Sequence, residues 1–451
     1  MTDRPNSLAA RDIAYYFHPA TNARRHEKVG PMMIERGEGI YVFDDQGKQY
    51  IEGLAGLWSV AVGFGEPRLA RAAADQMNKL PFYHSFSHKS HPSAVKLAER
   101  LVKMAPGMAK AHFTSSGSEA NDLTVKMIWY YNNALGRPNK KKMIARQRGY
   151  HGVSIVSGSL TGMPNFHRDF DLPLPFVRHV SCPNFWRYGQ PGETEEQFAS
   201  RLAQELDDLI VAEGPDTVAG FIGEPVMGAG GVMPPPATYW QKIQEVCRKH
   251  DVLLVADEVI TGFGRTGNPF ACQTYGIEPD FMVVSKAITS SYVPLSAILF
   301  TDKVYQVLAD NSAKLGVFAH GFTASGHPVA TAVALENLDI LEERELLTVA
   351  RRLGPQFQQR LRSFTYHPKI GEARGIGLIG ALEFVADKST KAPPSPVGSY
   401  GAKLVELCHE EGLIIRAIGD VVAFCPPLII TSEQIEEMFD RFGRALGRFE
   451  A

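Results

Sequence analysis

The chain has 451 residues and a formal net charge of −2, with 44% hydrophobic and 21% charged residues. This composition excludes a disordered chain, and the length predicts one large two-lobed unit or two to three domains with an ample core. The longest basic run, Lys140 to Lys142, is interpreted as a solvated loop, because it forms no stripe that could neutralise a row of phosphates. We therefore expect no nucleic-acid partner.

The cysteines and the N-terminus indicate the compartment. The five cysteines are scattered along the chain, at Cys182, Cys247, Cys272, Cys408 and Cys425. Because they include no C-x-x-C pair, they predict neither a disulfide framework nor a zinc site, and no metal is expected. They fit a reducing cytosol. The N-terminus lacks the apolar segment of a signal peptide, and no apolar run approaches the roughly 18 residues of a membrane span. We expect a cytoplasmic protein without a membrane partner.

The first half of the chain predicts an α/β fold. A polar arm leads into a predicted hairpin around the turn Asp44 to Gly47, then into a loop from Leu54 to Gly65 and an amphipathic helix from Arg68 to Leu80. From Ala111 onward, β-rich runs alternate with helical patterns, which favours a mainly parallel sheet. The β-rich runs are AHFTSS, MIARQ, VAGFIGEP, VLLVADE, FMVVS and LSAILF, and the helical patterns include Glu119 to Leu135 and Tyr239 to His250.

The last part of the chain has a different pattern. After Pro328, two helical stretches are followed by short strands in GIGLIGALEFV, LIIRAI and VVAFCPP and by a final helix from Ser432. This order is typical of an α+β segment, so we place a boundary near residue 328. The loop from Leu172 to Thr194 is long for a connector, and we interpret it as a functional or lid-forming excursion.

An acid and a lysine each follow a short apolar run. Asp257 ends the run from Val252, and Lys286 follows the run from Phe281 to Val284. Strands of this kind are buried on both faces of a parallel sheet, so both side chains are expected at strand C-termini, where open α/β sheets bind ligands. Desolvation there lowers the pKa of a lysine and exposes a nucleophilic amine, which suits a Schiff base with a carbonyl compound. Asp257 supplies the matching anion.

Two glycine patterns match the letters of the dinucleotide-binding fingerprint G-x-G-x-x-G but lack its structural context. The G-x-G-x-x-G at 262–267 runs into Asn268 and Pro269, and the one at 375–380 runs into a predicted strand. A dinucleotide site needs a strand before the pattern and a helix opening within it. We interpret both as turn or close-packing glycines.

A better anion site is the stretch from Thr114 to Asn121, which joins a predicted strand to a long helical pattern. A Ser- and Gly-rich turn at a helix N-terminus presents backbone N–H groups that can hold a phosphate. The alternative is a serine N-cap with a nearby glutamate in a capping box. Asp257 and Lys286 favour the phosphate interpretation. An aldehyde cofactor that carries a phosphate would use the Ser- and Gly-rich turn, the acid and the lysine together.

Six motifs then resemble one family, in that family's order and across nearly the whole chain. The chain resembles the class III, pyridoxal-phosphate-dependent aminotransferases, and Trp58, Phe86 and the GLIIR run ending at Arg416 are similar to the omega-amino-acid or amine:pyruvate branch. The motifs are SSGSEAND, RGYHG, EPVMGAGGV, DEVITGFGRTG, SKAITSSYVPLS and HGFTASGHP.

The resemblance implies the fold, which is the aspartate-aminotransferase-like fold of type I. In it, a large cofactor-binding domain with a mainly parallel sheet is joined by a smaller α+β domain built from both termini. We place the large domain at residues 66–327 and the two parts of the small domain at residues 1–65 and 328–451. The resemblance also implies a homodimer with shared active sites, and it leaves open whether two dimers pair into a tetramer.

By the same resemblance, pyridoxal 5′-phosphate is held as an internal aldimine on Lys286, which afterwards moves the proton between the substrate α-carbon and the cofactor. Asp257 keeps the pyridine nitrogen protonated. His151 is interpreted as structural rather than catalytic. The other cofactor-binding residues implied are Ser116, Gly117 and Ser118 at the phosphate, Thr323 from the neighbouring chain, Tyr150 and Val259 on the two ring faces, and Glu224 as a second acid near Asp257.

The implied substrate residues are Leu57, Trp58, Phe86, Tyr150, Ala229 and Arg416. Each aromatic among them could instead belong to the core. Arg416 is expected to hold the 2-oxo acid carboxylate through two parallel hydrogen bonds. Ala287 and Ser291 stand where many members of the family have glycines, and this difference could change the room near the lysine.

The implied function is transfer of an amino group from an amine or ω-amino acid to a 2-oxo acid such as pyruvate. The alternatives are an aminomutase or decarboxylase of the same fold, or a non-catalytic cofactor-binding protein.

Overall fold

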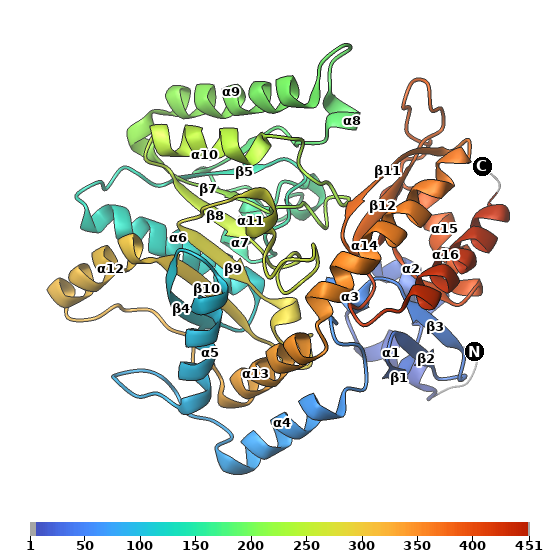
Figure 1. The fold of residues 1–451 in the computed structure, drawn as a ribbon, viewed down its shortest axis with the longest axis horizontal. Coiled ribbons are helices and arrows are strands. Elements are labelled where there is room, and N and C mark those ends of the chain that lie inside the picture. The colour runs from blue at the N-terminus through green and yellow to red at the C-terminus, as the bar shows by residue number, and fades with distance from the viewer. Residues whose placement is uncertain (1–5, 450–451) are drawn as a thin grey trace.

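The computed structural model describes residues 6–449, so the outermost ends of the predicted small domain, 1–5 and 450–451, lie outside the described residues. A seven-stranded sheet in the order β4-β10-β9-β8-β7-β5-β6 forms the centre of the larger lobe (Figure 1). Strands β5 to β9 pair in parallel, and only β10 runs antiparallel to its neighbours. The predicted, mainly parallel sheet is confirmed. The strands are β4 (Met108–Thr114), β5 (Lys142–Arg146), β6 (Val177–Val180), β7 (Val218–Gly223), β8 (Leu253–Asp257), β9 (Phe281–Val284) and β10 (Ser296–Thr301).

Side chains of the central strands alternate between two cores, one on each face of the sheet. On β8, Leu254 and Ala256 join the larger core, whereas Leu253 and Val255 join the core beneath α6 (Gly117–Ala134). This alternation follows from the two-residue period of a strand. It explains why these strands read as continuous apolar runs in the sequence.

Helices cover the sheet and build the smaller lobe. The longer helices besides α6 are α4 (Pro67–Lys79), α5 (Pro92–Met104), α9 (Glu195–Glu213), α10 (Tyr239–Lys249), α12 (Asp302–Leu315), α13 (Pro328–Glu343), α14 (Leu346–Ser363), α15 (Ser399–Glu410) and α16 (Ser432–Gly447). The shorter ones are α1 (Leu8–Tyr15), α2 (Ala23–Val29), α3 (Ala55–Trp58), α7 (Ile155–Leu160), α8 (Phe185–Tyr188) and α11 (Ala271–Tyr275), with 3-10 turns η1 (Pro164–Phe166), η2 (Pro215–Thr217), η3 (Lys286–Ile288) and η4 (Phe364–Tyr366). No helix within residues 6–449 is long and apolar enough to cross a membrane.

The smaller lobe joins the two ends of the chain. Its first sheet has the order β1-β2-β3-β13, in which β13 from the C-terminal segment pairs in parallel with β3 from the N-terminal segment. A second sheet has the order β11-β12-β15-β14. The division of the chain at 65/66 and 327/328 stays a prediction. The strands are β1 (Ile34–Glu38), β2 (Tyr41–Asp44), β3 (Gln49–Glu52), β11 (Ile370–Ile376), β12 (Ile379–Phe384), β13 (Leu413–Ile414), β14 (Arg416–Ile418) and β15 (Val421–Phe424).

The segment from Leu172 to Thr194 is not one long loop, and that prediction is wrong. It contains β6, which pairs in parallel with β5 at the sheet edge, and the short helix α8. The strand was missed because its sequence, VRHV, places two polar residues between two valines. The two glycine patterns do lie in turns, as predicted. The second one forms the tight turn between β11 and β12, where Gly377 has φ +54°.

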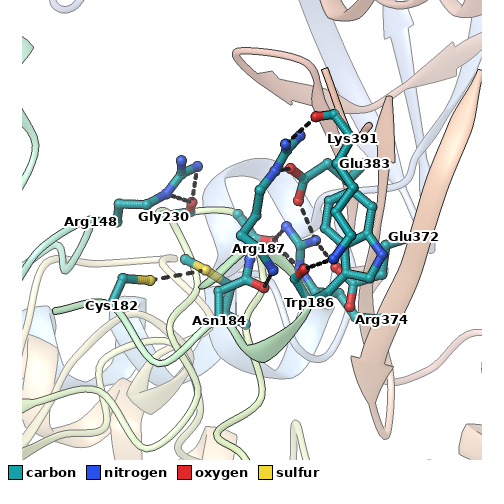
Figure 2. Close-up of polar contacts among 12 residues, drawn as sticks. Arg148, Cys182, Asn184, Trp186, Arg187, Gly230, Glu372, Arg374, Glu383 and Lys391 are labelled. Atoms are coloured by element: carbon teal, nitrogen blue, oxygen red, sulfur yellow. Dashed lines mark hydrogen bonds and ion pairs between the residues drawn. The ribbon is translucent and has the colours of Figure 1, made fainter. Parts of the chain in front are cut away.

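A buried ionic cluster joins the two lobes (Figure 2). Arg374 of β11 donates to the carbonyls of Gly231 and Val232 at 2.7 to 3.1 Å, and it pairs with the carboxylates of Glu372 and Glu383. Arg187 of α8 reaches Glu383 from the other lobe. This cluster fixes the glycine-rich loop after β7 against the smaller lobe.

Candidate active site

Lys286 follows β9 by two residues and starts the turn η3. Its φ is +49°, a left-handed conformation that non-glycine residues rarely adopt and that marks functional sites when the surroundings hold it in place. Burial lowers the pKa of its amine to about 8, although the acids Asp257 and Glu224 oppose that change. The structure therefore shows the predicted strand-end position of Lys286, and the lowered pKa agrees with the amine expected there.

Asp257 is the last residue of β8 and is held by three donors. Its Oδ2 accepts from His151 Nδ1 at 2.8 Å and from Asn121 Nδ2 at 2.9 Å, and its Oδ1 accepts from the Val259 amide at 3.1 Å. The Asp257 residue is only 3% exposed. Donors of this kind stabilise the ionised form of a buried carboxyl group. Sequence reasoning missed Asn121, although its place one turn after Gly117 on the same helix was a usable signal.

The loop before α6 is both a helix cap and an anion cradle. Ser116 Oγ accepts from the Glu119 amide at 3.2 Å, and Glu119 Oε2 accepts from the Ser115 amide at 2.8 Å, so the capping interpretation is confirmed for Ser116. Gly117 and Ser118 begin the helix, where backbone N–H groups have no partner within the helix and favour an anion. A Cβ at Gly117 would lie 3.3 Å from the side chain of Val259. Glycine at this position therefore lets the start of the helix pack closely against Val259.

Two further residues close the site. Glu224, which follows β7, is 3% exposed and accepts from the amides of Tyr150 and Gly228 at 3.0 and 2.8 Å. Burial raises the pKa of Glu224, and the nearby carboxylate of Asp257 adds to the rise. Burial also raises the pKa of Tyr150, whereas the positive charge of the Arg416 guanidinium lowers it.

One cavity brings together seven of the predicted residues. Those residues are Gly117, Ser118, Tyr150, Glu224, Asp257, Val259 and Lys286, and the cavity is also lined by Asn121, His151, Gly152, Ile260 and Ser285. The remaining predicted residues, Ser116, Thr323, Leu57, Trp58, Phe86, Ala229 and Arg416, lie outside that lining. Trp58 is 2% exposed, whereas Leu57 and Phe86 are 54% and 43% exposed. The chain by itself thus assembles the cofactor half of the predicted site more fully than the substrate half.

The sequence profile described as Aminotransferase class-III matches residues 21–446 of this chain. The chain belongs to the class III aminotransferases. It is 49% identical to gamma aminobutyrate transaminase 3, chloroplastic, of Solanum lycopersicum, over 99% of this chain and 87% of that protein. It is 51% identical to the probable gamma-aminobutyrate transaminase 3, mitochondrial, of Oryza sativa subsp. indica, over 95% of this chain and 84% of that protein.

Solved structures of transaminases share the fold. The omega transaminase of Pseudomonas jessenii, crystallised in complex with PMP, is 57% identical, covers 98% of both chains and superposes with a TM-score of 0.97. A variant of that enzyme, also at a TM-score of 0.97 and 57% identity over 98% of both chains, has a tryptophan, a phenylalanine and an arginine replaced and was engineered for the synthesis of enantiopure bulky amines. The aminotransferase described here is therefore a pyridoxal-phosphate enzyme of fold type I, and its reaction is transamination.

The residues in the cavity fit pyridoxal phosphate. The N-terminus of α6, at Gly117 and Ser118, suits the phosphate, and the fixed carboxylate of Asp257 suits a protonated pyridine nitrogen. Val259 and Tyr150 line the cavity and offer one apolar and one aromatic surface. The Lys286 amine, with its pKa lowered to about 8, suits a bond to the cofactor's carbonyl.

Proposed function

We propose that the enzyme transfers an amino group from an amine or ω-amino acid to a 2-oxo acid such as pyruvate. The observation that carries this proposal is that Lys286 and the triply held Asp257 line one cavity together with the N-terminus of α6. When bound, pyridoxal phosphate supplies a carbonyl for the amine and a cationic ring that withdraws electrons from the substrate carbon.

Different side chains of the protein bind the cofactor, move the proton and enclose the substrate carbon. Asp257, held by its three donors, would accept a hydrogen bond from the protonated ring nitrogen of the cofactor. Lys286, an amine with a pKa of about 8, would move the proton from the substrate carbon that bears nitrogen to the carbonyl carbon of the cofactor in the first half of the reaction, and in the reverse direction in the second half. Glu224 and Tyr150 limit the cavity and keep water from the reacting atoms.

The acceptor requires a cation for its carboxylate, and Arg416 is the proposed one. Arg416 begins β14, pairs with Ala423 of β15, and influences the pKa of Tyr150. A guanidinium binds a carboxylate through two parallel hydrogen bonds. The P. jessenii variant, in which a tryptophan, a phenylalanine and an arginine are replaced, supports assigning Trp58, Phe86 and Arg416 to substrate selection.

A donor and acceptor panel tests the proposal. Purified holoenzyme with pyruvate and either γ-aminobutyrate or an aryl-substituted primary amine should form alanine and the matching aldehyde or ketone. Arg416→Ala should raise the KM for pyruvate much more than the KM for the aryl-substituted amine, which has no carboxylate. An aminomutase or a decarboxylase would release no alanine, and a non-catalytic protein would consume neither substrate.

The active site is proposed to be shared in a homodimer. Thr323 is exposed and lies outside the cavity of its own chain, which supports a role at the phosphate of a neighbour. A Lys286→Ala chain and a Thr323→Asp chain should each be inactive, yet after subunit exchange their heterodimer should regain one intact site. Subunits that exchange without recovering activity would contradict sharing.

The cytoplasmic location predicted from the cysteines is also part of the proposal. It is supported by the finding that all five cysteines are free and buried.

A further inference from the structure

The N-terminal arm holds two imidazoles against one carboxylate, outside the cofactor cavity. Asp12 lies on α1, His26 on α2, and His18 in the connection between these helices. His18 Nε2 lies 2.9 Å and His26 Nε2 2.8 Å from the Asp12 carboxylate oxygens. One ligand atom from each of the three residues lies within 4.8 Å of the others. The three side chains are 25%, 12% and 14% exposed for His18, His26 and Asp12, so small solutes can reach them.

Few other contacts hold the arm: an exposed ion pair joins Arg25 of α2 to Glu406 of α15. Helices α1 and α2 have eight and seven residues, and neither has a buried residue. Helices this short are unstable alone in water, and most helices are stabilised by burying an apolar face. Each has a capping side chain, Ser7 for α1 and Asn22 for α2, but a cap fixes only its own first turn. The cluster of Asp12, His18 and His26 is the cross-link between the two helices.

The carboxylate of Asp207 forms ordinary ion pairs and serves as a comparison for Asp12. Asp207 faces one imidazole, that of His250 at 2.6 Å, and one ammonium, that of Lys249 at 2.8 Å. An ammonium group has no lone pair and cannot bind a metal. Asp12 instead faces two imidazoles, and each imidazole can offer a lone pair.

Two imidazole nitrogens and one carboxylate oxygen are a common ligand set for zinc and related dications, with a fourth position left to water. The present separations of 2.8 to 2.9 Å are those of hydrogen bonds. A tetrahedral ion at about 2.1 Å from each ligand separates its ligands by about 3.4 Å, so each contact would open by about half an ångström. Small rotations of the Asp12 and His18 side chains can supply these changes, because rotation of Asp12 moves its carboxylate relative to both imidazoles.

We propose that Asp12, His18 and His26 form a site for a transition-metal dication such as zinc, which cross-links α1 to α2. The prediction of no metal rested on cysteine spacing and did not consider these histidines. The site is separate from transamination, because none of its three residues lines the cofactor cavity.

Zinc titration of the holoenzyme tests the proposal. Protein without a polyhistidine tag, dialysed against a chelator and then freed of it, should bind one zinc ion per chain in calorimetry. Asp12→Asn and His26→Ala should each weaken this binding at least about 100-fold, because loss of a group behind a ligand already costs about 10- to 100-fold. His250→Ala, at the ordinary ion pair, should leave zinc affinity unchanged. Absence of one-to-one binding, or equal affinity in all variants, would overturn the proposal.

A second variant separates metal binding from a loosened arm. In His26→Cys a thiolate replaces the imidazole, so zinc should still bind although the present hydrogen bond to Asp12 is lost. Trypsin provides an independent readout, because the Arg24 side chain on α2 is 86% exposed. Zinc should slow cleavage at Arg24 in the parent and in His26→Cys, and should leave the rate unchanged in Asp12→Asn. Loss of zinc binding in His26→Cys, or protection that persists in Asp12→Asn, would contradict the assignment.

Discussion

His151 Nδ1 lies 2.8 Å from Asp257 Oδ2, and both side chains are buried beneath the cofactor cavity. Because a carboxylate can only accept, the imidazole must donate from Nδ1, and Asn121 donates to the same oxygen. We infer from this contact that His151 positions Asp257, which agrees with the structural rather than catalytic role expected from the sequence.

Asn121→Ala should lower kcat by about 10- to 150-fold while leaving the KM for the amine donor almost unchanged, because a hydrogen bond to a charged group contributes about 1.5 to 3 kcal/mol. The matched control is Asn132→Ala. Asn132 is also buried on α6, but its side chain donates only to the Ile128 carbonyl. Steady-state kinetics and thermal melting of both variants measure the difference. Equal kcat in the two variants would show that Asn121 supports only the helix.

The lowered pKa of Lys286, about 8 against an ordinary 10.5, predicts how the apoenzyme takes up its cofactor. Only the neutral amine attacks a carbonyl, so the rate of uptake should fall about tenfold per pH unit below 8 and level off above it. Between 8 and 10.5 the unfolded chain binds the extra proton, so apoenzyme stability should rise with pH across that window through this group. Absorbance-monitored uptake that keeps rising beyond pH 10 would contradict the lowered value.

Two neighbouring serines share a left-handed backbone but have different surroundings. Ser290 and Ser291 have φ of +48° and +57°. Ser290 Oγ donates to Asn337 and accepts from the amides of Ala61 and Val62, whereas Ser291 is exposed. Glycine relieves the backbone strain at both positions.

Ser291→Gly should therefore be neutral or slightly stabilising, and Ser290→Gly should destabilise by about 1 to 3 kcal/mol through its unpaired buried partners. Chemical denaturation of the two variants compares them directly. A larger loss of stability for Ser291→Gly than for Ser290→Gly would be inconsistent with this assignment.

Arg374 is predicted to be the residue that stabilises the cluster between the lobes most, because it pairs with Glu372 and Glu383 in its own lobe and donates to the carbonyls of Gly231 and Val232 in the other. Arg374→Met leaves the buried carboxylate of Glu383 and the half-buried carboxylate of Glu372 without this cation, and breaking a buried pair costs about 3 to 5 kcal/mol. The control, Arg248→Met, removes an exposed pair with Glu278 and should cost at most about 1 kcal/mol. Denaturant unfolding of both variants measures the costs. Similar losses would show that the cluster in Figure 2 adds no more than a surface pair.

Much of the catalytic half of the site was predictable from local sequence. Asp257 and Lys286 end apolar strands, and the Ser-Gly turn opens a helix, so their positions follow from strand and helix periodicity alone. Asn121 and His151 were missed as partners of Asp257 because three separate segments bring them together, and no single pattern encodes that contact.

The substrate half was less predictable for the same reason. Leu57, Phe86 and Thr323 lie on segments exposed in the single chain, and no periodic pattern indicates what they face. The edge strand β6 was missed because Arg178 and His179 interrupt its apolar pattern. Long-range pairing, such as that of β13 with β3, likewise depends on tertiary contacts that local propensity does not determine.

The central claim is that Lys286 carries the cofactor, and reductive trapping tests it most directly. The yellow holoenzyme should be reduced with borohydride, digested, and mapped by mass spectrometry. The phosphopyridoxyl group should be found on Lys286 and not on Lys140, a second buried lysine whose pKa is lowered by burial but whose ammonium donates to the carbonyls of Pro215 and His250. Lys286→Ala should lose both the label and transamination. A label on another lysine, or a Lys286→Ala enzyme that turns over at the parental rate, would contradict the account.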